Sequence, residues 1–338
     1  MAQKKIRAVQ FGCGPIGCAV ARLALQRADI ELVGAVDIDK NKVGRDLGEI
    51  VGIEKRVGVT VSDNADAVFA KAKADIAFHQ TNSSLPIVTP QLANILGFGV
   101  NILSTTEELS YPFKKQPKLA ADIDKLAKAN KVTVLATGVN PGFLMDTRAL
   151  GLTAVCAEVK KVKVVRIQDA RPRRLPFQKK IGSGCSLDQF KKLVAAGTLK
   201  HVGLPESIAM IAAGLGWDLD DITESIEPVV AKSRVESNYI RVEPGQVAGV
   251  RQVGRGFQAG EEVITLEFEA YLGAPESHDT VYITGTPNME VTIKSGVDGD
   301  IATAAIVVNA ARRAVEAPPG LLTMMDIPLV TCLERLKS

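Results

Sequence analysis

Short apolar runs alternate with helical stretches over the first 140 residues of the chain. The run IRAVQF (6–11) is followed by a glycine turn, GCGPIG (12–17), and by CAVARLALQRA (18–28), whose length and apolar spacing predict a helix. Further strands are predicted at 30–37, 57–61, 75–80, 99–105 and 131–137, and further helices at 64–73, 90–98 and 118–130. Apolar strands that alternate with helices are typical of a parallel sheet covered on both faces. The pattern therefore predicts an α/β fold with a Rossmann-type doubly wound parallel sheet.

The pattern changes after residue 140. Longer runs of alternating polar and apolar residues predict strands at 158–170, 261–273, 279–286 and 289–296, with helical inserts at 186–197 and 205–216. Such strands are typical of a half-exposed sheet in an α+β domain. A helical pattern at 300–317 closes the chain. We therefore expect a first domain over 1–140, an α+β domain over 141–298, and a C-terminal helix and tail over 299–338 that return to the first domain.

Composition narrows the function classes. The chain has 338 residues, of which 46% are hydrophobic, and a formal net charge of +3. The nearly balanced charge and low aromatic content argue against a nucleic-acid partner. No apolar run reaches the roughly 18–20 residues of a membrane helix, so we expect no membrane association. The opening MAQKKIRAVQFG lacks a small-residue cleavage site, and we therefore expect a cytoplasmic location.

The cysteines and histidines are scattered along the chain. Their spacing lacks the paired pattern of a zinc site, and free cysteines are typical of a reducing compartment. We therefore expect no metal centre. The residues concerned are Cys13, Cys18, Cys156, Cys185, Cys332, His79, His201 and His278.

The glycine turn has the spacing of a dinucleotide-binding fingerprint. Gly12 allows a tight turn, Gly14 a close approach of backbone to a pyrophosphate, and Gly17 close packing of the helix on the strand. Pro15 suits the first helical turn, where its missing N–H needs no partner, and Ile16 follows it. The phosphates are then expected at the positive end of this helix.

An acidic residue completes the fingerprint. Asp37 ends the second predicted strand, twenty residues after Gly17, where a carboxylate binds the ribose hydroxyls and repels a 2′-phosphate. This favours NAD, while Lys40 and Lys42 follow closely and soften the preference, leaving NADP as a second cofactor. The alternative is a simple glycine turn with a solvent-facing aspartate.

Two polar turns follow predicted strands of the same sheet. We expect Thr81 and Asn82, in QTNSS, to cover the cofactor, together with Asn140 in TGVNPGF. Pro141 and Phe143 are expected to shape the substrate side. The alternative for each residue is ordinary turn chemistry.

Adjacent carboxylates, Glu107 and Glu108, follow another strand in NILSTTEELSYP. Their position at the carboxyl end of a parallel strand points to chemistry in the ligand crevice. The same letters also contain two capping-box patterns, Ser104 with Glu107 and Thr105 with Glu108. The residues alone leave catalysis and helix capping equally open.

A basic segment follows in VVRIQDARPRRLPFQKKIGSG. In strand geometry Arg166 and Gln168 point to the same face. A guanidinium beside an amide donor is a suitable clamp for a substrate carboxylate. The alternative is a solvated sheet face.

Several of these motifs together resemble a known family. VQFGCGPIG, ELVGAVDID, NILSTTEELSYP, ATGVNPGFLMDT and APPGLLTMMDIP are similar to the 2,4-diaminopentanoate dehydrogenases and the native amine dehydrogenases related to them. The resemblance spans nearly the whole chain. It implies a nucleotide-binding domain like that of dihydrodipicolinate reductase, a homodimer, and oxidative deamination of an amine with NAD or NADP. It also implies a catalytic glutamate in TEEL, with Arg166, Gln168, His201 and Thr303 near a substrate carboxylate.

This chemistry gives the paired carboxylates a role. Oxidation of an amine leaves an iminium ion, to which water must add before ammonia leaves. A carboxylate can hold the substrate ammonium, stabilise the iminium ion and deprotonate the water. A second acid beside it tends to raise one pKa toward neutrality. On this basis Glu108 is the first choice for the base and Glu107 the second.

Other functions remain as alternatives. A reductase like dihydrodipicolinate reductase is the nearest, but its paired-histidine motif with a downstream lysine is absent from the sequence. A semialdehyde dehydrogenase needs a cysteine nucleophile, and no such motif surrounds Cys156. A redox sensor that binds NAD without turning it over is a further alternative, in which neither acid is needed for chemistry.

Overall fold

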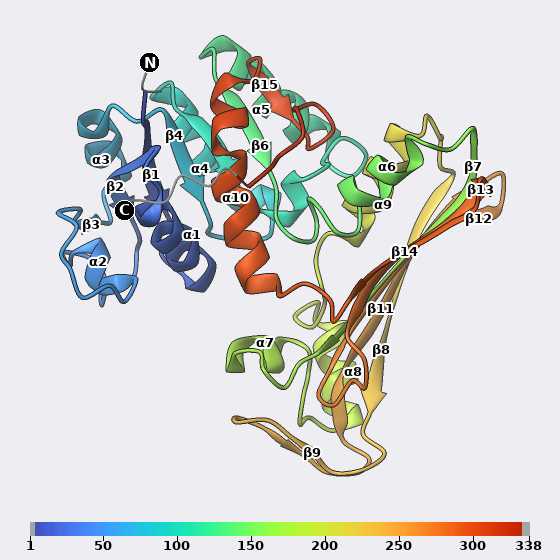
Figure 1. Ribbon diagram of the computed structural model, residues 1–338. Helices are drawn as coiled ribbons and strands as arrows, with labels where there is room; N and C mark the ends of the chain where they lie inside the picture. Colours follow the sequence, from blue (N-terminus) through green and yellow to red (C-terminus); the bar gives the residue numbers. More distant parts are fainter. Residues whose placement is uncertain (1–3, 333–338) are drawn as a thin grey trace. The chain divides into compact units, whose positions relative to one another are not determined.

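The computed structural model describes residues 4–332 and divides into two compact units (Figure 1). Unit 1 comprises the chain up to Phe143 together with the part from Asp298 onward, and unit 2 comprises Leu144–Val297. The C-terminal segment expected over 299–338 is part of unit 1, and its last residues, 333–338, lie outside the described part of the chain.

Unit 1 is built on a seven-stranded sheet whose neighbouring strands all run parallel. Its strands are β1 (Ile6–Phe11), β2 (Ile30–Val36), β3 (Val61–Ser62), β4 (Ile76–His79), β5 (Asn101–Ser104), β6 (Thr133–Ala136) and β15 (Gly320–Leu322). The order β15-β6-β5-β4-β1-β2-β3 places the switch of direction between β1 and β4. Open α/β sheets bind ligands at the carboxyl ends of the strands beside this point. The predicted doubly wound α/β fold is confirmed.

Helices cover this sheet and bury most of its strand residues. They are α1 (Pro15–Gln26), α2 (Leu47–Ile50), α3 (Ala65–Ala72), α4 (Leu85–Gly97), the short 3₁₀ helix η1 (Glu107–Leu109), α5 (Pro117–Ala129) and α10 (Gly299–Glu316). Every residue of β4 and β6 is buried, as expected for apolar strands packed on both faces. The C-terminal helix α10 packs beside α1 (Figure 1), and the tail after it adds β15 to β6.

Some boundaries in unit 1 differ from those predicted. The strand expected at 57–61 is reduced to Val61–Ser62. The helix expected at 90–98 begins earlier, at Leu85, because Pro86 takes the favourable first turn and Pro90 lies inside the helix. The strand β15 lies in a segment for which the sequence pattern predicted no strand.

Unit 2 contains a six-stranded mixed sheet in the order β14-β13-β7-β12-β11-β8. Its strands are β7 (Glu158–Asp169), β8 (Asp221–Val230), β11 (Val247–Gln258), β12 (Glu261–Tyr271), β13 (His278–Thr286) and β14 (Met289–Lys294). The pair β7 and β12 is parallel and the other pairs are antiparallel. A short hairpin pairs β9 (Val235–Glu236) with β10 (Arg241–Val242). The predicted α+β character of this half is confirmed.

The helices of unit 2 are α6 (Thr147–Thr153), α7 (Leu175–Lys180), α8 (Leu187–Ala195) and α9 (Leu204–Gly214). Helix α9 packs on β11, where glycines make room for it. A Cβ atom at Gly254 or Gly256 would lie 2.8 Å from Ile208 of α9. Glycine weakens the strand pattern of a sequence, which explains why β11 was not predicted.

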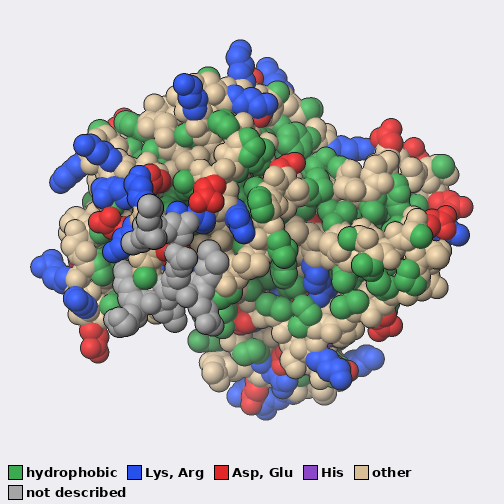
Figure 2. All heavy atoms as spheres, turned by 45° about the horizontal axis from the view of Figure 1, so that its top comes forward, with side chains coloured by type: hydrophobic (Ala, Val, Ile, Leu, Met, Phe, Trp, Pro, Cys, Tyr) green, Lys and Arg blue, Asp and Glu red, His purple; other side chains and the backbone are tan. Residues whose placement is uncertain are grey.

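The surface mixes charges of both signs. Lys and Arg side chains stand among Asp and Glu side chains on the face shown in Figure 2. Among the described residues, no helix is long and apolar enough to cross a membrane.

Candidate active site

The glycine turn after β1 has the form that a nucleotide-binding turn requires. Gly12 has φ +90°, and a Cβ atom there would lie 2.3 Å from the carbonyl oxygen of Gln80. At Gly17 a Cβ atom would lie 1.9 Å from the carbonyl oxygen of Gly12, so only glycine fits. At Gly14 nothing lies within 4 Å of the added atom. Gly14 is also the N-cap of α1 and provides no side-chain cap, which leaves the first amides of that helix for a ligand.

A buried glutamine side chain stabilises this turn by hydrogen bonding to its backbone. Gln10 lies in β1 and is fully buried, and its Nε2 donates to the carbonyl oxygen of Gly12 at 2.8 Å. The same nitrogen lies 2.7 Å from Oε1 of Gln80, at the end of β4. Sequence reasoning missed this residue, although a glutamine inside the apolar run IRAVQF was the signal for it.

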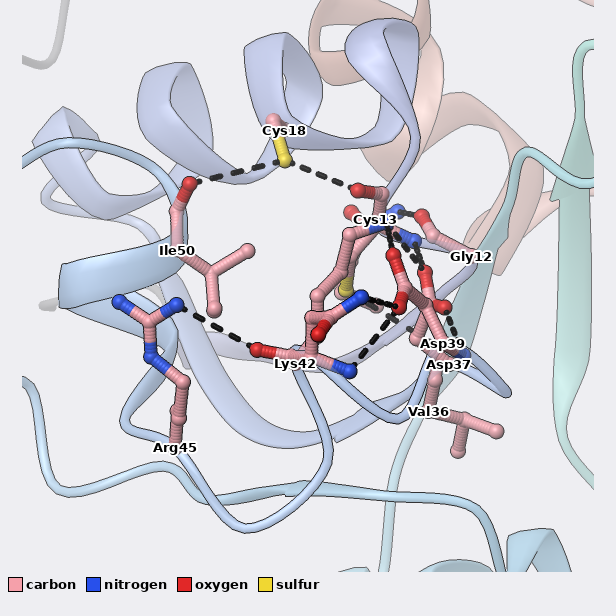
Figure 3. A network of polar contacts seen from close by, with 11 residues as sticks. Gly12, Cys13, Cys18, Val36, Asp37, Asp39, Lys42, Arg45 and Ile50 are labelled. Carbon is pink, nitrogen blue, oxygen red and sulfur yellow. Dashed lines mark hydrogen bonds and ion pairs between the residues drawn. The ribbon is translucent and has the colours of Figure 1, made fainter.

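Asp37 ties the end of β2 to the glycine turn (Figure 3). Its Oδ2 accepts the backbone N–H of Cys13 at 2.7 Å, and its Oδ1 accepts that of Asp39 at 2.8 Å. Lys42 places Nζ 3.4 Å from the same Oδ2. Partial burial opposes the charge of Lys42, but Asp37 and then Asp39 raise its pKa. Asp37 is 8% exposed, so the alternative of a solvent-facing aspartate is wrong.

A chain of polar side chains joins the turns after β4 and β5. Nδ1 of His79 lies 3.0 Å from Oγ of Ser104, which donates to Oγ1 of Thr106 at 3.0 Å. Thr106 in turn donates to the carbonyl oxygen of Asn82 at 2.8 Å. Burial lowers the pKa of His79 to about 4, so this histidine is neutral near pH 7. Sequence reasoning considered His79 only as a metal ligand and missed this network.

Thr81 and Asn82 form the turn that this network holds. Oγ1 of Thr81 donates to Oε1 of Gln91 at 2.7 Å, and Oδ1 of Asn82 accepts the N–H of Ser84 at 2.9 Å. Asn82 therefore takes part in local turn chemistry, whereas Thr81 contacts a side chain of α4. Their expected contact with a cofactor stays a prediction.

Glu108 caps the N-terminus of α4, and not a helix that begins at Thr105 as the capping-box pattern suggests. Its Oε2 accepts the N–H of Leu85, the first residue of α4, at 2.9 Å and Nε2 of Gln116 at 2.9 Å. Its Oε1 pairs with Nζ of Lys115 at 3.1 Å. Partial burial raises the pKa of Glu108, but these bonds outweigh it and leave the pKa below its usual value. The expected rise toward neutrality is therefore wrong for Glu108.

Neither predicted capping box is formed as written. The N-cap of η1 is Thr106, without a side-chain cap bond, instead of Ser104 or Thr105. The backbone N–H of Glu108 donates to the carbonyl oxygen of Ser83 at 3.2 Å. Glu107 is half-buried at the first position of η1.

The turn after β6 lies beside the C-terminal helix. The N–H of Val139 donates to Oγ1 of Thr303, on α10, at 3.4 Å. Asn140 is 9% exposed, whereas Phe143 exposes 37% of its surface. The Asn140–Pro141 peptide bond is cis. Residues more than 150 positions apart in the sequence thus meet at one end of the sheet.

Arg166 and Gln168 share one buried face of the unit 2 sheet. Nη2 of Arg166 and Nε2 of Gln168 both donate to the carbonyl oxygen of Val297, at 2.8 and 3.0 Å. Arg166 is 2% exposed and forms an ion pair with Asp279. Nη1 of Arg173 donates to Oε1 of Gln168 at 3.0 Å. The prediction of a shared face is confirmed, and the alternative of a solvated sheet face is wrong.

A cavity of about 300 Å³ lies near this face within unit 2. The ring of His201 stacks on Phe268 with centroids 4.6 Å apart. Burial, then Lys180 and Arg166, lower the pKa of His201 to about 3, so its ring is neutral. The cavity is lined by Arg174, Pro176, Phe177, Lys180, Ile181, Lys200, His201, Val250 and Phe268. Three of these side chains are cationic and none is acidic, which suits an anionic group.

Comparison with known proteins identifies two family models along the chain. The C-terminal domain of 2,4-diaminopentanoate dehydrogenase matches residues 143–337. The N-terminus of dihydrodipicolinate reductase matches residues 6–107.

Individual relatives match the chain over nearly its full length. A 2,4-diaminopentanoate dehydrogenase from Acetoanaerobium sticklandii is 34% identical over 96% of this chain and 94% of its own. An amine dehydrogenase from Streptomyces virginiae is 23% identical over 98% of each chain. The solved structure of an amine dehydrogenase from Mycobacterium smegmatis superposes with a TM-score of 0.86 at 26% identity, covering 97% of this chain and 98% of its own. By contrast, a 4-hydroxy-tetrahydrodipicolinate reductase from Carboxydothermus hydrogenoformans is 39% identical over only 23% of this chain and 29% of its own.

Proposed function

The chain belongs to the 2,4-diaminopentanoate dehydrogenase family, and from that premise we propose that it catalyses NAD(P)-dependent oxidative deamination of an amine or diamino acid. The products are the ketone and ammonia, and the reverse reaction is reductive amination. The observation that best supports this proposal is the 34% identity to a 2,4-diaminopentanoate dehydrogenase over 96% of this chain. A reductase like dihydrodipicolinate reductase is less well supported, because the match to such an enzyme covers only 23% of the chain.

Unit 1 fits a nicotinamide dinucleotide. Gly12 and Gly17 allow the tight turn, because a Cβ atom at either would collide with backbone oxygens, and Gly14 presents open backbone at the N-terminus of α1. We assign the pyrophosphate to this turn, including Pro15 and Ile16, since Gly14 makes no side-chain cap bond and the amides after Pro15 remain for a ligand. When bound, the nicotinamide supplies the hydride acceptor of the reaction.

We propose that Asp37 binds the ribose and makes NAD the preferred cofactor. The carboxylate sits at the end of β2, where dinucleotide-binding folds place the ribose ligand. Ile38 follows it with 87% of its surface exposed, and this apolar surface suits an adenine ring.

The reaction needs one carboxylate that can accept a proton. After hydride loss from the carbon bearing nitrogen, water adds to the iminium carbon, a proton leaves, and cleavage of the C–N bond releases ammonia. Glu108 is poorly suited, because both its oxygens hold partners and its pKa is lowered. Successive side chains of a 3₁₀ helix point about 120° apart, so Glu107 projects in a different direction from Glu108. We therefore propose Glu107 as the base and Glu108 as the residue that fixes η1 to α4.

The remaining predicted site residues of unit 1 are proposed to line the cofactor and substrate sites. Thr81, Asn82 and Asn140 are proposed to face the cofactor, because they follow strands at the carboxyl edge of the sheet. The proposed walls on the substrate side are Pro141, Phe143 and Thr303.

Unit 2 is proposed to bind a substrate carboxylate through its cationic cavity. Lys200, Arg174 and Lys180 supply positive charge there, and the neutral ring of His201 supplies a polar edge. Arg166 is already paired with Asp279, so we propose that it acts with Gln168 mainly to shape the face beside the cavity.

We also propose that the protein is a cytoplasmic homodimer, as the family resemblance implies. Sedimentation velocity of the purified chain tests this, because a monomer and a dimer differ twofold in mass. A monomer that retains full activity would remove the homodimer from the proposal.

The function is tested by following cofactor reduction with a panel of diamino acids, amino acids and simple amines. We expect turnover of at least one amine, together with release of ammonia. Intact NAD binding without turnover of any member of the panel would instead favour the redox-sensor alternative.

A further inference from the structure

Lys42 is held loosely beside a firmly held acid (Figure 3). Its Nζ lies 3.4 Å from Oδ2 of Asp37 and 3.4 Å from Oδ2 of Asp39. Both contacts are longer than the roughly 2.7–2.9 Å of a tight charge-assisted bond. The Lys42 side chain also keeps 25% of its surface exposed. It can therefore leave this position at low cost.

Asp37 cannot move in the same way. Its two oxygens hold the backbone amides of Cys13 and Asp39 at 2.7 and 2.8 Å, and 8% of the residue is exposed. The acid is thus held at the proposed ribose position by two short bonds, whereas the cation beside it is held by two longer contacts. A phosphate on the ribose 2′ position would meet the negative charge of Asp37 and find Lys42 within reach.

We propose that Lys42 is a movable counter-charge that lets this chain bind both dinucleotides. It pairs with Asp37 when the ribose carries a 2′-hydroxyl, and with the phosphate when the ribose carries a 2′-phosphate. The inference rests on cofactor binding within the proposed function, but not on which amine is oxidised.

Neighbouring cations are less well placed for this role. Arg45 donates from Nη1 to the carbonyl oxygen of Asn41 at 3.3 Å, and its Nε lies 3.5 Å from Glu49. Lys40 is exposed, and within residues 4–332 it has no hydrogen bond or ion pair. Lys40 therefore provides a matched control, with the same charge two residues away.

The test measures dissociation constants of NADH and NADPH by nicotinamide fluorescence, with no amine present. We expect Lys42→Ala to weaken NADPH binding about ten- to hundredfold, the usual effect of losing a charge-assisted bond, with NADH changed less than about threefold. Lys40→Ala should leave both dissociation constants within about twofold, because a solvated charge contributes little.

A second variant allows the effect of Lys42→Ala to be compared in two backgrounds. Asp37→Asn keeps one oxygen acceptor for the turn but removes the charge, and it should strengthen NADPH binding. If Lys42 is the phosphate partner, most of this gain disappears in the double variant Asp37→Asn with Lys42→Ala. Equal loss of both cofactors in Lys42→Ala, an equal effect of Lys40→Ala, or an undiminished gain in the double variant would each overturn the proposal. A failure of the amine assay would leave these binding results unchanged.

Discussion

The carboxylate of Glu108 accepts the backbone N–H of Leu85 at 2.9 Å. Glu108 follows β5 and Leu85 follows β4, so the bond ties together two turns at the carboxyl ends of neighbouring strands. With its further contacts to Lys115 and Gln116, the Glu108 carboxylate stabilises these two turns. The adjacent acid, Glu107, is then the better candidate for chemistry.

Glu107→Gln is expected to abolish most turnover without unfolding the protein. The amide cannot take a proton from water, and loss of a general base usually lowers the rate about 10²- to 10⁴-fold. Steady-state kcat and the melting temperature measured on one preparation separate the chemical effect from a stability effect.

The matched variant Glu108→Gln should behave in the opposite way. It keeps one oxygen for Leu85 but loses the ion pair with Lys115, so we expect retained turnover and a modestly lower melting temperature. Glu108→Ala removes all three partners and should cost about 1–3 kcal/mol of unfolding free energy. Loss of turnover in Glu108→Gln at a native melting temperature, with an active Glu107→Gln, would return the base to Glu108.

Gly14→Ala should weaken cofactor binding while leaving the fold unchanged. Gly14 has extended backbone, and no atom lies within 4 Å of an added Cβ, so the methyl group meets only a ligand. We expect at least about a tenfold increase in the NADH dissociation constant, equivalent to ~1.4 kcal/mol, with an unchanged melting temperature. Gly97→Ala, which also has open space around it, is the control and should leave binding intact. Unaltered binding in Gly14→Ala would place the pyrophosphate elsewhere.

The buried ring of His79 should make the free energy of unfolding depend on pH. Its folded-state pKa is lowered from 6.5 to about 4, so the unfolded chain takes up the proton first as the pH falls. The stability that neutral His79 contributes is present above about pH 6.5 and is lost as the pH falls toward 4. This loss amounts to at most about 3 kcal/mol. Urea unfolding of His79→Gln across this range should show a shallower decline than the parent chain.

His278→Gln is the control for this measurement, because His278 lies on β13, outside the unit 1 network. It should keep the decline of the parent chain. The decline expected to remain in His79→Gln comes from His201, whose pKa is lowered to about 3, and from carboxyls with a lowered pKa such as those of Glu267 and Asp169. Identical slopes for His79→Gln and the parent chain would contradict the buried neutral histidine.

Variants of Arg166 and Lys200 should separate an effect on stability from an effect on substrate binding. Arg166→Ala leaves Asp279 buried without its partner, and breaking a buried pair costs about 3–5 kcal/mol of unfolding free energy. Lys200→Ala should instead raise KM about tenfold for a diamino acid, the usual effect of losing one charge-assisted bond. It should leave the KM of a simple amine unchanged. Equal changes on both substrates would exclude the cavity as the carboxylate site.

Much of unit 1 could be predicted because its signals are local. The glycine turn, the apolar strands and the acid at the end of β2 each lie within a few residues of one another in the sequence. The strand β11 could not be predicted in this way. Gly254 and Gly256 make room for α9, and they interrupt the alternation of polar and apolar residues that is typical of a strand.

The site was harder to predict because its contacts are distant in sequence. Leu85 lies 23 residues before Glu108, and Asp279 lies 113 residues after Arg166. A sequence shows that an acid is present, but only the fold shows which partner holds it. That is why the sequence favoured Glu108 as the base but could not show that its carboxylate accepts the N–H of Leu85.

The fate of one hydrogen tests the proposed chemistry most directly. An amine substrate with deuterium on the carbon bearing nitrogen is incubated with the protein and NAD, and the reduced cofactor is analysed by mass spectrometry. Direct hydride transfer predicts one deuterium in each NADH formed, with one ammonia released per NADH. NADH without deuterium, or NADH formed without ammonia, would contradict the assignment of the chain as an amine dehydrogenase.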